Sequence, residues 1–126
     1  MTAAYAAWEI REPDFVAEVA QTDPLELRLS GSADMSTKVP LEALIQRLHG
    51  QLKAQGLGKV RVDLRQLEFM SAASFTALVG WLSLINELPP ERRYRIQFQS
   101  NPLIRWQRRS LGALSCFATD VVAVET

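Results

Sequence analysis

A short alternation of apolar and polar residues near the start of the chain predicts a β-hairpin. Within residues 25–30, leucines alternate with polar side chains, the period of two that is typical of a half-buried strand. Residues 14–20 precede this strand, and residues 21–24 between the two segments read Gln-Thr-Asp-Pro, which favours a turn. Residues 31–34, Gly-Ser-Ala-Asp, are expected to end the second strand.

Beyond the hairpin, the period of the apolar residues changes repeatedly between that of a helix and that of a strand. Glycines at 56 and 58 stop the first helical pattern, Ser71 is placed to cap the second helix, and two prolines follow that helix. The predicted elements are, in order, a helix from Leu41 to about Leu52, a strand over 59–64 continuing through Leu67 and Phe69, a helix from about Ala72 to about Leu88, a strand over 94–99, a helix opened by Asn101 and Pro102 and running to about Leu114, and an edge strand over 121–125.

This alternation predicts an α/β sandwich in which helices pack on a mostly parallel sheet, and the N-terminal hairpin makes that sheet mixed. The chain has 126 residues, 48% of them apolar. That length suits a single domain over residues 1–126, with a core over about 14–124, and it buries enough surface to fold without disulfides or metals.

The net charge of zero argues against generic binding to nucleic acid or to an anionic membrane, because phosphate binding requires a surplus of Lys and Arg. The charge is unevenly distributed, however. Residues 1–34 hold seven acids and two bases, whereas residues 35–126 hold seven acids and twelve bases. We therefore expect recognition by this chain to be local, with the basic surface in its C-terminal part.

The chemistry-bearing residues are few. One Cys and one His exclude an intramolecular disulfide and a four-ligand zinc site, and no dinucleotide, phosphate-loop, nucleophile-elbow or paired-carboxylate motif occurs. His49 is expected at the flank of its helix, and Cys116 as a small buried group. With no basic leader and no long apolar run, the sequence predicts a cytoplasmic protein without catalytic residues, metal or cofactor.

The second predicted helix is apolar on two sides. One stripe suits the sheet, and it consists of Phe75, Leu78, Val79 and Leu82. The other stripe, nearly opposite, consists of Ala77, Trp81, Leu84 and Leu88. Exposed Trp and Leu are typical of interface anchors, so Trp81, Leu84 and Leu88 are a candidate surface for a partner or a second copy. The alternative is cover from the same chain by Tyr5, Trp8 and Ile10.

Arginines recur between positions 92 and 109 without an acid among them. Arg105, Arg108 and Arg109 are candidates for binding an anion or an acidic surface, and Trp106 offers a flat face beside them. The alternative interpretation is a solvated face spread over a strand and a helix.

The stretch from Val60 to Leu78 resembles the centre of the STAS domain, a family named for sulphate transporters and anti-sigma-factor antagonists. That centre reads roughly D-L-x-x-V-x-F-I/M-D-S-S/T-G-L-x-x-L. The matching positions here are Asp63, Leu64, Leu67, Phe69, Met70, Phe75 and Leu78. The resemblance extends over about residues 14–124, including a strand that ends in Gly31 and Asp34, and it implies a STAS-like fold.

The chain departs from the family at its switch. In the antagonists of this family, the Ser of the D-S-S-G stretch accepts phosphate from a partner kinase, which abolishes binding to that kinase. Residues 71–74 here read Ser-Ala-Ala-Ser, so Ala72 offers no hydroxyl at that position. Ser71 and Ser74 remain candidates for modification because a helix N-terminus favours phosphate; alternatively, Ser71 only caps the helix. The family pattern places Asp34 beside this loop, although an Asp after Gly also suits a simple turn.

The resemblance implies a non-catalytic interaction module of the anti-sigma-factor antagonist or partner-switching type. Its switch loop would consist of Asp34, Ser71, Ala72, Ala73 and Ser74. Without the usual phosphoacceptor it would be a constitutive binder of a kinase-like partner, a structural subunit, or a module regulated by association instead. Two alternatives stay open: a STAS domain that senses a nucleotide or lipid, and a STAS subunit beside an ABC-type lipid transporter.

Overall fold

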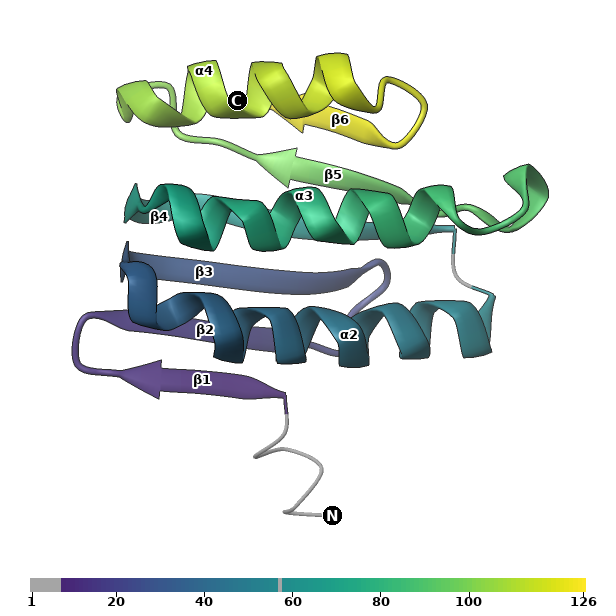
Figure 1. Ribbon diagram of the computed structural model, residues 1–126, viewed down its shortest axis with the longest axis horizontal. Helices are drawn as coiled ribbons and strands as arrows, with labels where there is room; N and C mark the ends of the chain where they lie inside the picture. The colour runs from purple at the N-terminus through teal and green to yellow at the C-terminus, as the bar shows by residue number, and fades with distance from the viewer. Residues whose placement is uncertain (1–7, 57) are drawn as a thin grey trace.

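The computed structural model describes residues 8–56 and 58–126, which form one six-stranded sheet with helices against it (Figure 1). The strands are β1 (Glu9–Glu12), β2 (Phe15–Ala20), β3 (Leu25–Ala33), β4 (Lys59–Met70), β5 (Arg95–Gln99) and β6 (Val122–Glu125). The helices are α2 (Lys38–Gln55), α3 (Ala72–Asn86) and α4 (Arg105–Phe117), with the 3-10 helices η1 (Met35–Thr37) and η2 (Pro90–Arg92).

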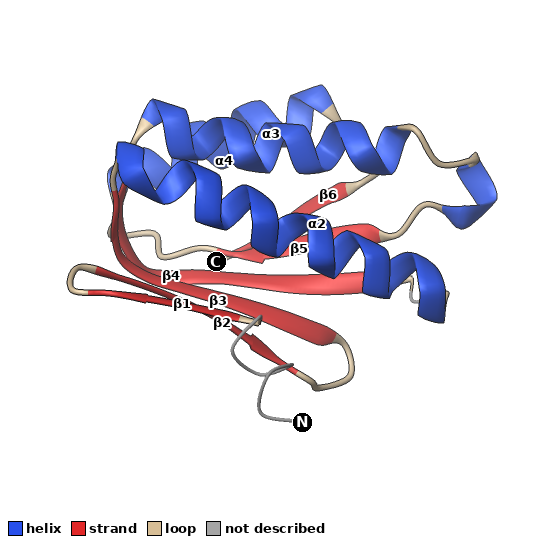
Figure 2. Ribbon diagram, turned by 60° about the horizontal axis from the view of Figure 1, so that its bottom comes forward, coloured by secondary structure: helices blue, strands red, loops and turns tan. Residues whose placement is uncertain are grey.

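The strands lie in the sheet in the order in which they occur along the chain. β1, β2 and β3 are antiparallel neighbours, and each pair from β3 to β6 is parallel. Figure 2 shows α2, α3 and α4 on the same face of the sheet, as expected when successive parallel crossovers share one hand. The predicted mixed, mostly parallel α/β sandwich is confirmed; β1 had no counterpart among the predicted strands.

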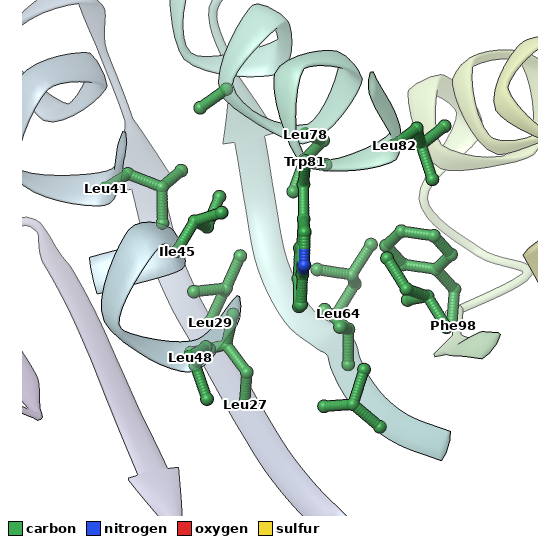
Figure 3. Close-up of a cluster of buried hydrophobic side chains, with 14 of the residues drawn as sticks. Leu27, Leu29, Leu41, Ile45, Leu48, Leu64, Leu78, Trp81, Leu82 and Phe98 are labelled. Atoms are coloured by element: carbon green, nitrogen blue, oxygen red, sulfur yellow. The ribbon is translucent and has the colours of Figure 1, made fainter. Parts of the chain in front are cut away.

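The core lies between the helices and the sheet (Figure 3). Alternate strand residues such as Leu27, Leu64 and Phe98 point toward the helices and are almost fully buried, which explains the period of two in the sequence. α2 contributes its own stripe of apolar residues, and α3 lies between α2 and α4 in the helical layer. The other sheet face carries charged pairs instead, including Glu26 with Arg28 and Arg61.

β3 continues past the predicted end at residue 30. Gly31 has a φ of +90°, and a side chain there would meet the Asp14 carbonyl oxygen at 2.1 Å. The pairing with β4 shifts register on both sides of this segment and then continues to Ala33. Glycine thus allows a bulge rather than a stop, and this carries β3 to the same end of the molecule as the start of α3.

α4 begins at Arg105, four residues after the predicted start at Asn101. Asn101 accepts a hydrogen bond from the backbone N–H of Leu103 at 2.9 Å and donates one to the Arg65 carbonyl at 3.1 Å. These contacts hold residues 101–104 in a turn because the side chain of Asn competes with a helix for backbone partners. The prediction of a helix from Asn101 was therefore wrong.

That turn and the start of α4 complete the hydrogen bonding of β4. β4 pairs with β5 only over its first five residues, Lys59 to Asp63, so its second half has a free edge. The Gln107 side chain donates to the carbonyls of Leu64 and Leu67 at 2.6 and 2.9 Å. Trp106 donates to a further β4 carbonyl at 2.8 Å. The aromatic ring predicted for stacking is thus a structural donor.

None of the helices in the described part of the chain has the length and apolar character needed to cross a membrane.

Candidate functional site

The start of α3 and the end of β3 are joined by hydrogen bonds. Ser71 caps α3, as predicted, by accepting from the Ser74 backbone N–H at 3.1 Å. The Ser74 hydroxyl donates to the Asp34 carbonyl at 2.6 Å, and the Ser71 N–H donates to the Ala33 carbonyl at 2.7 Å. β3 and β4 are parallel neighbours, so their carboxyl ends place these segments together. The structure thus brings Asp34 and residues 71–74 into one site.

Asp34 begins η1 at the exposed edge of this site. Its carboxylate accepts from the Ser36 hydroxyl at 2.6 Å and from the Ser36 backbone N–H at 2.9 Å. These bonds stabilise the ionised form and hold the pKa of Asp34 below its ordinary value. Asp34 therefore fits both alternatives from the sequence, because it forms a turn and also lies beside the loop that contains residues 71–74.

The two serines and two alanines of the switch segment differ in accessibility. Ala72 is exposed, Ser71 and Ala73 are half-buried, and Ser74 is buried. Because the Ser74 hydroxyl lies inside the protein and is hydrogen-bonded, a phosphate cannot be accommodated there without opening the contact between α3 and Asp34. Of the two serines suggested for modification, only Ser71 is partly accessible.

Several exposed apolar side chains lie at the same end of the molecule as the start of α3, and the sequence did not predict their exposure. Met35 is 76% exposed, Val39 71%, Phe69 49% and Leu103 88%. They belong to η1, the first turn of α2, the end of β4 and the turn before α4, all at one end of the molecule in Figure 1. We refer to Met35, Val39, Phe69, Ala72 and Leu103 as the helix-start surface.

The prediction of Trp81 as a partner-binding residue was wrong. Its side chain is fully buried and its indole N–H donates to the Tyr94 hydroxyl at 2.7 Å. α3 is the central helix and packs against α2 and, through the core, against the sheet (Figures 1 and 3), so the second apolar stripe faces a neighbouring helix. Leu84 and Leu88, from the same predicted surface, are half-buried.

The predicted N-terminal cover does not account for the burial of Trp81 either. Ile10 pairs with Ala17 at the β1 edge of the sheet, whereas Ile45 of α2 lies near Trp81 in the core (Figure 3). Trp8 is half-buried against the core, and Tyr5 lies outside the described residues.

His49 and Cys116 are also placed differently from expectation. His49 is buried, with its Nδ1 atom 2.6 Å from the Tyr94 hydroxyl oxygen. Burial lowers the pKa of His49 below its ordinary value, and the nearby Lys53 adds to this effect. Cys116 lies in the last turn of α4 and is exposed, because that turn projects beyond the sheet-facing residue Leu114.

The arginines between positions 92 and 109 do not form one face. Arg93 donates to the Leu88 and Asn86 carbonyls, both at 2.9 Å, at the end of α3. Arg105, Arg108 and Arg109 are exposed on α4, beyond the other end of β5. The six arginines as a group are therefore dispersed over the surface, as the alternative interpretation stated. The three arginines on α4 remain a predicted anion site.

No protein-family model matches this chain, and no curated protein is significantly similar to it. Among solved structures, the chain is similar to the crystal structure of an anti-sigma factor antagonist from Mycobacterium paratuberculosis. The two share 20% sequence identity with a TM-score of 0.59, and the match covers 90% of each chain. At this identity the likeness is one of fold, and the chain therefore has the STAS-like fold that its central motif implied.

Proposed function

We propose that this chain is a non-catalytic interaction module of the anti-sigma-factor antagonist, or partner-switching, type, which binds a regulatory protein through the helix-start surface. The observation that supports it most strongly is that several exposed apolar side chains lie at the end of the molecule that holds the Ser71 cap. A single exposed apolar residue requires no explanation, but several around one feature are typical of a protein-binding surface.

The surface is also rigid, which favours binding. Hydrogen bonds from Ser71 and Ser74 fix η1 to α3, and Asn101 and Trp106 fix the turn before α4 to β4. A backbone that is already held in place adds little ordering cost when a partner covers it, so only the side chains lose rotamer freedom. The contact energy is therefore available for affinity.

Binding through this surface would be independent of phosphorylation at position 72. Ala72 is exposed where the resembling family carries its phosphoacceptor, and the buried Ser74 hydroxyl does not substitute for it. A constitutive binder regulated by association, rather than by a kinase, is the consequence.

The test is binding of the full chain to a panel of purified candidates that includes anti-sigma-factor kinases and ATPase subunits of ABC-type lipid transporters. Val39→Asp and Leu103→Asp should each weaken capture at least tenfold, because a carboxylate would be buried without a partner. The matched control is Phe117→Asp, an exposed apolar residue at the other end of α4, which should bind as the unchanged chain does.

Two results would contradict the proposal. One is full binding by both Asp variants with native circular dichroism. The other is phosphate found by mass spectrometry on Ser71 after incubation with ATP and the captured kinase, which would reject constitutive binding. Capture of a transporter subunit in place of a kinase would reject the anti-sigma-factor role and retain the surface.

A further inference from the structure

A pocket of about 460 Å³ lies between α4, the turn that follows β5 and the end of β6. The residues that line it are Ser100, Asn101, Pro102, Arg108, Gly112, Ser115, Val124 and Thr126. Its volume is within the range of small-molecule sites, about 300–1,000 Å³.

The fold produces this pocket for a simple reason. β6 is only four residues long and is held at its end by the Ser100 backbone N–H, which donates to the Glu125 carbonyl at 2.8 Å. α4 lies beside this short edge strand, and Gly112 on the exposed side of the helix leaves space in the pocket because it has no side chain. Apart from its chain neighbours and the nearby backbone of its own helix, a Cβ built at Gly112 would meet no atom of the described structure within 4 Å.

The chemistry of the wall defines the ligand. Arg108 is the one charged side chain among the described residues that line the pocket. It forms no ion pair with any residue that the structure describes. Ser115 adds a hydroxyl, while Pro102 and Val124 supply apolar walls, Val124 being 41% exposed. A guanidinium recognises carboxylate or phosphate oxygens through paired donors, and the apolar walls favour a ligand with a hydrocarbon portion.

We propose that this pocket binds a small organic anion, a carboxylate or phosphate monoester with an apolar body, with Arg108 on the anionic group and Pro102 and Val124 against the apolar part. Of the three arginines on α4, only Arg108 contacts the ligand in this proposal, and Arg105 and Arg109 face solvent. The pocket does not depend on the helix-start surface, so either proposal can fail without the other.

The experiment titrates the ¹⁵N-labelled full chain with octanoate and with phenyl phosphate, following backbone amide resonances. At least one probe should give saturable shifts confined to the residues around the pocket, 100–103 and 108–115, and the amide of Val124. Octanol and inorganic phosphate, which each lack one half of the proposed chemistry, should bind at least fivefold more weakly. The stronger probe identifies the headgroup as carboxylate or phosphate.

Matched variants locate the site. Arg108→Gln should weaken the better probe roughly tenfold, the loss expected for one charge-assisted contact, whereas Arg109→Gln should change its affinity less than twofold. Gly112→Leu fills the pocket and should abolish the shifts. Its control, Gly50→Leu, alters another helix glycine with open space around it and should bind normally.

Two outcomes would overturn the proposal. The first is the absence of saturable shifts with either probe at millimolar concentration. The second is unchanged affinity in Arg108→Gln, or octanol binding as tightly as octanoate, since either result removes the guanidinium from recognition. Because Arg108 is exposed, its substitution should leave the fold intact, so the test holds even if Gly112→Leu fails to fold.

Discussion

Removing the buried hydroxyl group of Tyr94 should destabilise this protein strongly, although the change involves a single oxygen atom. Tyr94 is almost fully buried before β5, and its hydroxyl oxygen accepts from the indole N–H of Trp81 at 2.7 Å. The same oxygen lies 2.6 Å from Nδ1 of His49. Since the Tyr oxygen accepts from Trp81, its own proton is free for a neutral His49. Burial raises the pKa of Tyr94 and keeps the hydroxyl protonated.

Tyr94→Phe removes a partner from two buried groups and changes the packing volume very little. An unsatisfied buried donor or acceptor costs about 1–3 kcal/mol. Trp81 is fully buried, whereas His49 is 7% exposed and retains some access to water. We therefore expect a loss of about 2–4 kcal/mol, a large fraction of the 5–15 kcal/mol typical of a small domain.

The assay is urea unfolding at pH 7.5, monitored by circular dichroism, with the m-value required to stay constant. The control is a double-mutant cycle with Trp81→Phe, which should cost less in the Tyr94→Phe background by at least about 0.5 kcal/mol, the coupling expected of residues in contact. A loss below about 1 kcal/mol, or strictly additive substitutions, would show that the two hydrogen bonds do not stabilise the core.

Three further predictions concern other features of the fold. Burial holds the pKa of His49 below its usual value near 6.5, so the unfolded chain binds a proton at His49 more readily than the folded chain does. The free energy of unfolding should therefore be unaffected by His49 above about pH 6.5 and should decrease as the pH falls below that value. In urea unfolding measured between pH 5 and 7.5, His49→Gln should remove this pH dependence. Gln107→Leu should lower the free energy of unfolding, measured in urea, by about 2 kcal/mol or more, because two β4 carbonyls lose their hydrogen-bond partner. An unchanged urea midpoint would refute the role of Gln107 as the hydrogen-bond donor to β4. Gly31→Ala should cost about 1–3 kcal/mol from the strained φ and the clash with Asp14, whereas Gly50→Ala in an exposed helix should be neutral or stabilising by melting temperature; equal effects would contradict the bulge argument.

Part of the candidate site was predictable because it depends on local chemistry. Ser71 caps α3, as a Ser before an apolar run should, and the missing hydroxyl at Ala72 is a property of the sequence itself. The exposure of Met35 and Leu103 was not predictable. An apolar residue in a loop carries no periodicity, so only the packing around it shows whether it is covered.

The sequence by itself determined the kinds of elements, most of their boundaries and the mixed α/β class, because period, turns and caps act over a few residues. The STAS-like fold was implied by the resemblance of residues 60–78 to that family. Tertiary structure decided which apolar side chains are inside. α3 packs on two neighbours, so Trp81 is core and joins His49 through Tyr94. It also decided where α4 begins, because the free edge of β4 needed the side chain of Gln107. Burial and hydrogen-bond satisfaction are properties of the whole packed chain, and local pattern does not contain them.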